Sequence, residues 1–396
     1  MPLIEPRYHW TFLALFGVFT VFGTSMTIIG ALLPTILTSF GWDYFTAGLV
    51  LGANAVAYFS FTFVGGYLVK ILGAKRTILL GLAIESLGLL FFAATPDPLT
   101  NIVLSAVIGV GLGCVEISVN WTTLRLDTAK TGRPMNLMHG AFALGAIIGP
   151  VALNLLMAGG FHWATVYRCM SAVFALLAVL ILFLDMSMTA TTAEDAPVAG
   201  DRRLSRHPAY WLSFLALFFY VGVELGVSNW VAEYFVSIFA YPATQSAMLV
   251  SLFWTGLLAG RFGVPLLYHG DRQDVVLIGF STLATFSIAA LSGLAFVPLG
   301  QFTVTIGLVL VFLSGLGASI FYPAVITLLG NCFPRAQSQA IGFAATGGGI
   351  GAFLFPFLMS AMAQGWGLRV GFATYAVFGV AMTVAAIGLS LAARKR

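Results

Sequence analysis

Long apolar runs recur along this chain and constrain its fold more than any other feature. Each run is about 20 residues or longer, which suffices for a helix to cross the hydrocarbon core of a bilayer. Twelve such runs occur, and a polar stretch separates the sixth from the seventh. The predicted spans cover residues 10–37, 46–69, 77–95, 100–124, 135–158 and 163–184, and then 209–238, 245–268, 275–297, 301–329, 338–362 and 370–392.

The composition supports spanning helices. Of the 396 residues, 60% are apolar and 8% are charged, whereas soluble domains carry about 25% charged residues. A membrane β-barrel would show alternating segments of about ten residues, and the sequence lacks that alternation. We therefore expect an all-α protein whose surroundings are the lipid bilayer.

The sequence offers little for catalysis or for a cofactor. Cys114, Cys169 and Cys332 lie in apolar runs without metal-ligand spacing, so they are interpreted as packing residues. No Ser/His/Asp set, metal-ligand cluster or phosphate loop occurs in the sequence. We expect a protein that is not an enzyme and binds no cofactor; a membrane enzyme that uses His139 with a carboxylate is the least favoured alternative.

A polar segment at 187–208 predicts a boundary between two halves. Its charged residues, together with Thr, Ala and Pro, cannot pack a core, so it is predicted to be a cytoplasmic linker. The bundles expected on either side are 1–186 and 209–396. Landmarks repeat between them: the sequence FLALF at 12–16 recurs at 214–218, and the sequence GLG at 111–113 recurs at 315–317. We infer two duplicated six-helix bundles.

Basic residues predict the orientation, because Lys and Arg are retained on the cytoplasmic side. With both termini inside, only Arg168 and Arg369 of the 18 basic residues face outward. We expect an integral protein of a bacterial inner membrane, and the net charge of +4 requires no nucleic-acid partner. Function as a monomer is a separate expectation that these residues do not determine. The predicted cytoplasmic set is Arg7, Lys70, Lys75, Arg76, Arg125, Lys130, Arg133, Arg202, Arg203, Arg206, Arg261, Arg272, Arg335, Arg394, Lys395 and Arg396.

The glycine-rich segment 109–120 carries Glu116 and, one helical turn later, Asn120. A charged carboxylate at the bilayer centre costs about 2.5 kcal/mol or more, so such a group is neutral, paired or next to water. A carboxyl that alternates between dry and wet surroundings can bind and release a proton. We predict that Glu116 couples protons and that Asn120 binds substrate. The alternative is a carboxyl that only hydrogen-bonds Asn120 or a neighbouring helix.

The seventh span carries Glu224, Asn229 and Trp230. Carboxylate and amide groups hydrogen-bond sugar hydroxyls, and an indole face stacks on a pyranose ring. These residues are predicted to bind a polyol substrate. The alternatives are a structural hydrogen bond for Glu224 and an interfacial anchor for Trp230.

Weaker candidates for substrate binding are His139, Trp254 and Tyr322. Their alternative roles are pairing with a helix end for His139 and packing for the two aromatic residues. Glu85 in the third span is interpreted as a structural partner. Arg261, toward a cytoplasmic end, is expected to satisfy helix C-terminal carbonyls rather than to gate the pore.

Twelve spans in two parallel repeats resemble the major facilitator superfamily over the whole chain. The family's motif after the second span is present in part, but the basic Lys70 stands where the family has an acidic residue. The matching positions are Gly66, Leu68, Gly73, Lys75 and Arg76.

Within that superfamily, segments 109–120, 137–146 and 219–230 resemble the fucose permease and glucose/mannose proton symporter group. The resemblance implies a central cavity lined by spans 1, 4, 7 and 10. Two positions depart from fucose permease: Gly30 stands in place of an aspartate, and Phe142 replaces one of two polar residues in span five.

The resulting hypothesis is proton-coupled symport of a hexose or related sugar by alternating access, with Na⁺ as a possible coupling ion instead. The alternative is a proton-driven exporter of drug-like molecules, because exporters of this superfamily carry a glycine and proline motif at the place of residues 145–150. Close helix packing explains that motif here and at 347–356 in the second half.

Overall fold

The structure is a computed structural model, and it describes residues 4–127, 133–187, 204–268, 272–297, 300, 302–333 and 337–394. In these ranges every regular element is a helix, and eleven helical segments are long and apolar enough to cross a membrane. The expected all-α membrane fold is confirmed. The helices are α1 (His9–Phe40), α2 (Tyr44–Leu72), α3 (Ala74–Phe91), α4 (Pro98–Leu126), α5 (Arg133–Ala158), α6 (Thr165–Leu182), α7 (Pro208–Phe239), α8 (Ala247–Leu267), α9 (Gln273–Leu294), α10 (Thr303–Ala318), α11 (Phe321–Cys332), α12 (Gln337–Trp366) and α13 (Leu368–Arg394), with short 3₁₀ turns η1 (Pro6–Tyr8), η4 (Leu204–Arg206) and η5 (Ala243–Gln245).

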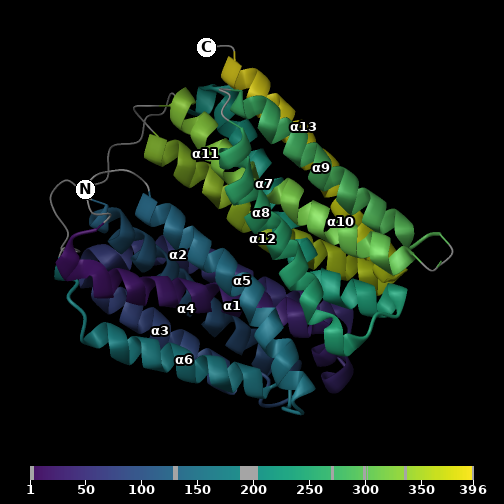
Figure 1. Cartoon of the computed structure of the whole chain (residues 1–396), viewed down its shortest axis with the longest axis horizontal. Coiled ribbons are helices and arrows are strands. Elements are labelled where there is room, and N and C mark those ends of the chain that lie inside the picture. Colours follow the sequence, from purple (N-terminus) through teal and green to yellow (C-terminus); the bar gives the residue numbers. More distant parts are fainter. Residues whose placement is uncertain are drawn as a thin grey trace. The chain divides into compact units, whose positions relative to one another are not determined.

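Two expected spans differ in detail from the observed helices. The third span is α3, a helix of 18 residues that carries Lys75, Arg76 and Glu85 and is therefore less apolar than the eleven others. The tenth span is divided into α10 and α11 (Figure 1). Its two halves meet at Ser319 and Ile320.

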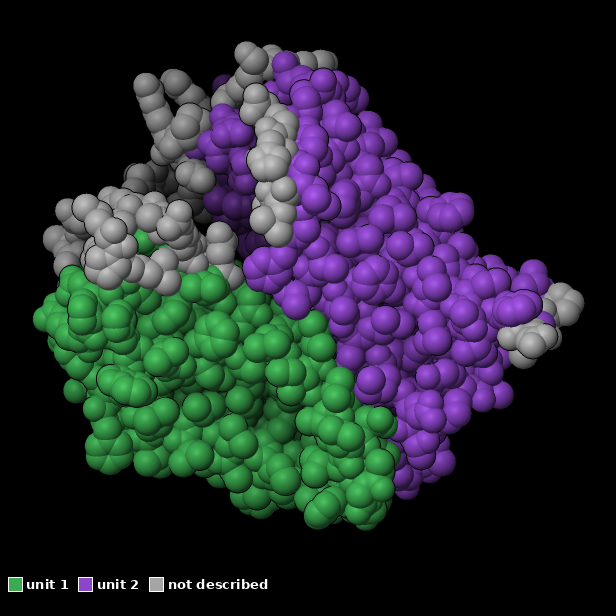
Figure 2. Space-filling view, viewed as in Figure 1, with its two compact units in different colours: residues 1–29, 49–197 green, residues 30–48, 198–396 purple. Residues whose placement is uncertain are grey.

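The chain forms two compact units, coloured separately in Figure 2. Unit 1 comprises Met1–Ile29 and Leu49–Pro197, and unit 2 comprises Gly30–Gly48 and Val198–Arg396. The end of α1 and the start of α2 therefore belong to unit 2. Residues 188–203 of the predicted linker lie outside the described residues, so the linker boundary stays a prediction. The predicted cytoplasmic residues Lys130, Arg202, Arg203, Arg335, Lys395 and Arg396, and the side chain of Arg133, also lie outside them.

Glycines bring α1 and α5 into backbone contact within unit 1. A methyl group placed on Gly145 would lie 1.7 Å from the carbonyl oxygen of Thr20, and one on Gly23 would lie 2.1 Å from that of Phe142. Unit 2 repeats this arrangement between α7 and α12, where a methyl on Gly351 would lie 1.9 Å from the Phe218 carbonyl oxygen. Close packing, expected for the glycine and proline segments, is confirmed in both units.

Helix α4 uses two faces. A methyl on Gly113 would lie 2.5 Å from the Tyr58 carbonyl oxygen of α2, and one on Gly111 would lie 2.6 Å from Glu85 Cβ of α3. In Figure 1, α3 lies alongside α4 and α6, which it contacts. In unit 2, Gly315 faces the corresponding helix α8. Gly113 and Gly315 thus occupy equivalent positions in the two units, 202 residues apart. Alignment of the two GLG motifs in the sequence instead pairs Gly111 with Gly315, 204 residues apart, and is therefore out of register by two residues.

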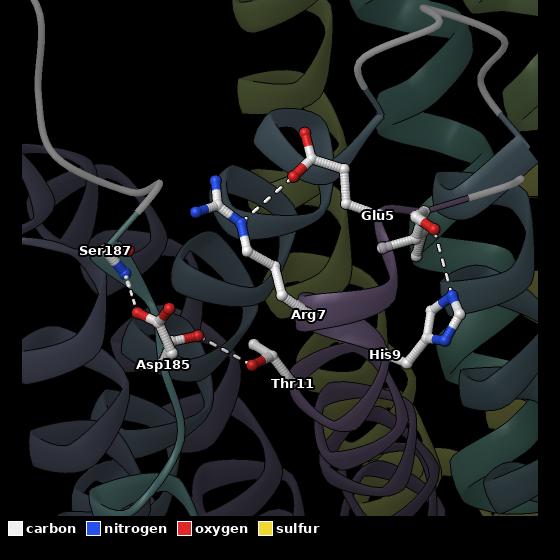
Figure 3. A network of polar contacts seen from close by, with 7 residues as sticks. Glu5, Arg7, His9, Thr11, Asp185 and Ser187 are labelled. Atoms are coloured by element: carbon white, nitrogen blue, oxygen red, sulfur yellow. Dashed lines mark hydrogen bonds and ion pairs between the residues drawn. The ribbon is translucent and has the colours of Figure 1, made fainter.

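Polar contacts fix the end of α6 at the edge of unit 1 (Figure 3). Thr11 Oγ1 donates to the Asp185 carbonyl oxygen at 2.8 Å, and Lys75 Nζ donates to the Leu184 carbonyl oxygen at 2.8 Å. The backbone N–H of Ser187 donates to Asp185 Oδ1 at 2.9 Å and holds the pKa of that carboxyl below its usual range. The start of α1 and the start of α3 are both tied to this end of α6.

Candidate functional site

Glu116 lies on α4, half-buried, and faces α2 of the same unit. Tyr58 Oη donates to Glu116 Oε2 at 2.6 Å, and Thr62 Oγ1 lies 3.4 Å from the same oxygen. Tyr58 and Thr62 are one helical turn apart, so both hydroxyls point to the same place. Among the described residues, Glu116 forms no ion pair. Its carboxyl is therefore held by neutral hydrogen-bond donors alone.

Asn120 follows Glu116 by one turn, and its Oδ1 is buried without a hydrogen-bond partner. A buried amide oxygen in this condition has lost its interaction with water without replacing it. An incoming hydroxyl or water can therefore bind there. This arrangement agrees with the expected substrate role of Asn120, which stays a prediction.

An aromatic cluster lies between the Glu116 site and α5. The ring of Phe22 is 6.1 Å from Tyr58 and 5.8 Å from Phe142, and Phe142 is 6.5 Å from Phe19. His139, exposed on α5, lies edge-on to Phe19 at 6.1 Å. His139 thus borders the aromatic cluster, and its role in binding stays a prediction.

Glu224 on α7 lies in a different environment, in unit 2. Tyr220, one turn earlier, donates to Glu224 Oε1 at 2.8 Å, and Arg261 Nη2 of α8 lies 4.0 Å from that oxygen. Tyr220 itself stacks on Phe321 of α11 with ring centroids 4.8 Å apart. Glu224 therefore has a positive charge beside it and a fixed rotamer, and it is 8% exposed.

Arg261 also supplies a hydrogen-bond donor at the break between α10 and α11. Pro323 lacks the N–H that would bond to the carbonyl of Ser319, four residues earlier. Arg261 Nε donates to that carbonyl at 3.2 Å instead. The expected role of Arg261 at helix-terminal carbonyls is confirmed, and its approach to Glu224 is an additional feature that the sequence did not reveal.

Asn229 and Trp230 lie where α7 meets the end of α1 inside unit 2. A methyl on Gly30 would lie 2.7 Å from Asn229 Cα, so only glycine permits this contact. Trp230 is fully buried, its Nε1 lacks a partner, and its ring lies edge-on to Tyr44 at 5.9 Å. The alternative that Trp230 anchors at the membrane interface is wrong, because an interfacial anchor must be exposed.

The two weaker aromatic candidates also lie in unit 2. Trp254 of α8 is 2% exposed, and its Nε1 donates to Ser228 Oγ at 2.8 Å. This hydrogen bond joins α8 to α7 next to Asn229. Tyr322 is exposed on α11. Substrate contact by either residue stays a prediction.

The structure thus divides the predicted site residues between the units. Unit 1 holds Glu116, Asn120 and His139, and unit 2 holds the others. Sequence reasoning missed the groups that surround the two carboxyls. The tyrosine one turn before Glu224 could have been found from spacing alone, whereas Tyr58, Thr62 and Arg261 come from other helices and carry no such signal. The predicted residues of unit 2 are Glu224, Asn229, Trp230, Trp254 and Tyr322.

Repeated apolar helices define a polytopic membrane protein, and carboxyls inside its spanning segments are typical of transporters. The chain belongs to the Major Facilitator Superfamily, whose family model matches residues 14–298 and 248–396. The resemblance noted in the sequence is confirmed. Members of this family are transporters and not enzymes, so the expectation that this protein is not an enzyme is confirmed.

Individual relatives are similar over nearly the whole chain. A glucose/mannose transporter of Bacillus subtilis (strain 168), GlcP, is 23% identical and covers 97% of this chain and 95% of its own length. A glucose/galactose transporter of Brucella abortus biovar 1 (strain 9-941) is 23% identical, with 93% and 91% covered. The solved structure of the nucleoside transporter NupG matches with a TM-score of 0.77 at 13% identity, covering 97% of this chain and 99% of that one. This structural match concerns the fold alone.

Proposed function

We propose that this chain is a secondary active transporter that imports a hexose or related sugar together with a proton by alternating access. The relatives named as glucose/galactose and glucose/mannose transporters support a sugar substrate. We assign proton coupling to Glu116 and substrate binding to Glu224. This assignment rests on the contrast between the two carboxyls: Glu116 contacts neutral hydroxyls, and Glu224 lies beside Arg261.

Glu116 suits proton coupling because its partners tolerate both protonation states. Tyr58 donates to the carboxylate, whereas the Thr62 hydroxyl donates to the Tyr58 carbonyl at 2.9 Å and lies 3.4 Å from Glu116 Oε2. Both hydroxyl oxygens have lone pairs that can accept from the protonated acid. No nearby cation fixes the ionised form in the described part of unit 1. A proton can therefore bind and leave without breaking an ion pair.

Glu224 suits substrate binding because its carboxyl and the Arg261 guanidinium lie together, so acceptors and donors for hydroxyl groups are side by side. A carboxyl group has lone pairs for several hydrogen bonds, and a guanidinium donates charge-assisted hydrogen bonds, which are stronger than neutral ones. Tyr220 occupies one acceptor position on Oε1. The remaining lone pairs are available for vicinal hydroxyls of a sugar.

The test is uptake of radiolabelled hexoses into proteoliposomes under imposed pH or sodium gradients. We expect accumulation driven by the pH gradient. The Glu116→Gln variant should lose accumulation but keep counterflow, the exchange of labelled for unlabelled sugar, because exchange needs no net proton movement. A matched control is Glu5→Gln, which removes an exposed carboxyl outside the spans.

Three results would change this proposal. Gradient-driven accumulation by Glu116→Gln would show that the coupling proton binds elsewhere. Accumulation that is driven by a sodium gradient and does not depend on pH would show that the coupling ion is Na⁺ and not the proton. Failure to take up any common hexose, together with dye extrusion, would establish the alternative function, a proton-driven exporter of drug-like molecules.

We also propose a bacterial inner-membrane location with both termini cytoplasmic, and function as a monomer. The distribution of basic residues supports this orientation. Reaction of a cysteine introduced at Glu5 with a membrane-impermeant reagent tests it. Labelling only after the membrane is opened is expected, and labelling of intact cells would place the N-terminus outside.

A further inference from the structure

Unit 1 contains a small cavity that the proposed coupling by Glu116 does not use. Its volume is about 30 Å³, and its lining is contributed by α1, α2, α3, α4 and α6. A cavity needs roughly 10–15 Å³ by this measure to hold one water molecule, which also needs two to four polar partners. The cavity is therefore large enough for water if its walls provide such partners.

Two side chains on the wall provide them. The hydroxyls of Ser25 on α1 and Tyr167 on α6 are buried, and neither has a hydrogen-bond partner. The other polar side chains of the wall are already engaged: Asn54 Nδ2 donates to the Ser105 carbonyl at 3.0 Å, and Ser105 Oγ donates to the Val50 carbonyl at 2.8 Å. Ser25 and Tyr167 thus face the cavity with unused hydrogen-bonding capacity.

Glu85, on α3, neighbours Ser25 of α1 and does not itself line the cavity. Its side chain is 0% exposed, and neither carboxyl oxygen has a hydrogen-bond partner. The stem packs against Gly111, where any larger residue would collide with Glu85 Cβ. The Ser25 hydroxyl is the polar side-chain group next to the carboxyl, although the two are not in hydrogen-bond geometry. Because Ser25 also lines the cavity, its hydroxyl can accept from a protonated Glu85 while it bonds to water in the cavity.

The elements packed against Glu85 offer no compensating charge. The titratable group of α4 on this side is the buried thiol Cys114, one turn away next to Gly81. On α6, Arg168 donates to a backbone carbonyl at the end of α3. Lys75, on α3 itself, is bound to carbonyls at the end of α6. In the described residues Glu85 forms no ion pair, so an ionised carboxylate there would be buried without compensation.

We propose that Glu85, Ser25 and Tyr167 form a hydrated proton-binding site. The protonated Glu85 carboxyl donates a hydrogen bond to Ser25 Oγ, and the hydroxyls of Ser25 and Tyr167 hold water in the cavity. The carboxyl proton then exchanges with that water through the Ser25 hydroxyl. Glu85 is then a second proton-binding carboxyl of unit 1, on the opposite flank of α4 from Glu116. This inference does not depend on which substrate is transported.

The test is infrared spectroscopy of the reconstituted protein without substrate. The stretching band of a protonated carboxyl group is expected at neutral pH, and Glu85→Gln should remove it. On transfer to heavy water the band should shift as the proton exchanges through the cavity. Ser25→Val, which removes a hydroxyl and fills space, should slow this exchange about tenfold, the effect of one lost hydrogen bond.

Controls separate this role from a general effect on packing. Ser118→Ala removes a buried hydroxyl that donates to the Cys114 carbonyl, and it should leave the exchange rate unchanged. Tyr167→Phe reports on the same band if Glu85→Gln fails to fold, and it should slow exchange as Ser25→Val does. The proposal is overturned if no band depends on Glu85, if added sodium removes the band, or if neither Ser25→Val nor Tyr167→Phe slows the exchange.

Discussion

Replacement of Gly30 by alanine tests how closely α1 and α7 approach in unit 2. A methyl group at this position would lie 2.7 Å from Asn229 Cα and 2.9 Å from the Ser228 carbonyl oxygen. Ordinary contact begins at 3.4 Å, and the neighbours are backbone atoms that cannot rotate away. The two helices must therefore separate by several tenths of an ångström.

The expected loss of stability is the difference between two effects. Overpacking of a close contact costs about 1–3 kcal/mol. Alanine gains up to about 1 kcal/mol over glycine in helix propensity. We expect Gly30→Ala to lower the free energy of unfolding by up to about 2 kcal/mol, a factor of up to roughly 30 in the ratio of folded to unfolded protein.

Unfolding of the purified protein in detergent, by heat or denaturant, measures this change. The matched control is Gly279→Ala in α9, where no atom lies within 4 Å of the added methyl. That variant should be neutral or more stable by up to about 1 kcal/mol. Equal effects of the two substitutions would refute the reasoning. The same geometry predicts that Gly30→Asp destabilises unit 2 further, because the aspartate of fucose permease cannot be placed here without moving α1.

Two further predictions concern polar groups. Arg261→Met should lower the free energy of unfolding by about 1–3 kcal/mol and weaken sugar binding in counterflow, because Glu224 loses its cation; unchanged stability and affinity would contradict both roles. Hydrogen bonds from Thr100 hold the pKa of Asp97 below its usual value. The stability that Asp97 gives the start of α4 is therefore fully present at pH values above the pKa that Asp97 has in the unfolded chain. It is lost as pH falls through the lower pKa that Asp97 has in the folded protein. Amide hydrogen exchange at the start of α4 should become faster at low pH, relative to the intrinsic exchange rate, in the wild type but not in Asp97→Asn. The same pH dependence in both proteins would contradict this role of Asp97.

The fold was predictable because the bilayer imposes a simple rule on sequence. Backbone groups in hydrocarbon must bond within one helix, so each span leaves a continuous apolar run. Glycine spacing in segments 145–150 and 347–356 also predicted close packing correctly. The register of the repeat was harder: Gly111 and Gly113 look equivalent in sequence, yet they face different helices, and only the contacts distinguish them.

The surroundings of the candidate site residues were less predictable, because they come from tertiary contacts. Glu116 and Asn120 were singled out because a polar side chain in a spanning helix requires an explanation. The hydroxyls that bind Glu116 lie more than fifty residues away in sequence. Gly30 shows the converse: in the sequence it was only a position that departs from the aspartate of fucose permease, whereas the structure gives it a packing role against Asn229.

The break in the tenth span shows what would have been needed to predict more. Pro323 is visible in the sequence, and the rule that proline frees the carbonyl four residues earlier points directly to Ser319. That carbonyl, buried in the bilayer, requires a donor from another helix. Arg261 was expected to satisfy some helix-terminal carbonyl, and the structure shows that it satisfies this one at 3.2 Å while lying 4.0 Å from Glu224. The arginine therefore links the backbone break in α10 and α11 to the carboxyl proposed to bind substrate, so a shift of α11 would alter the charge beside Glu224.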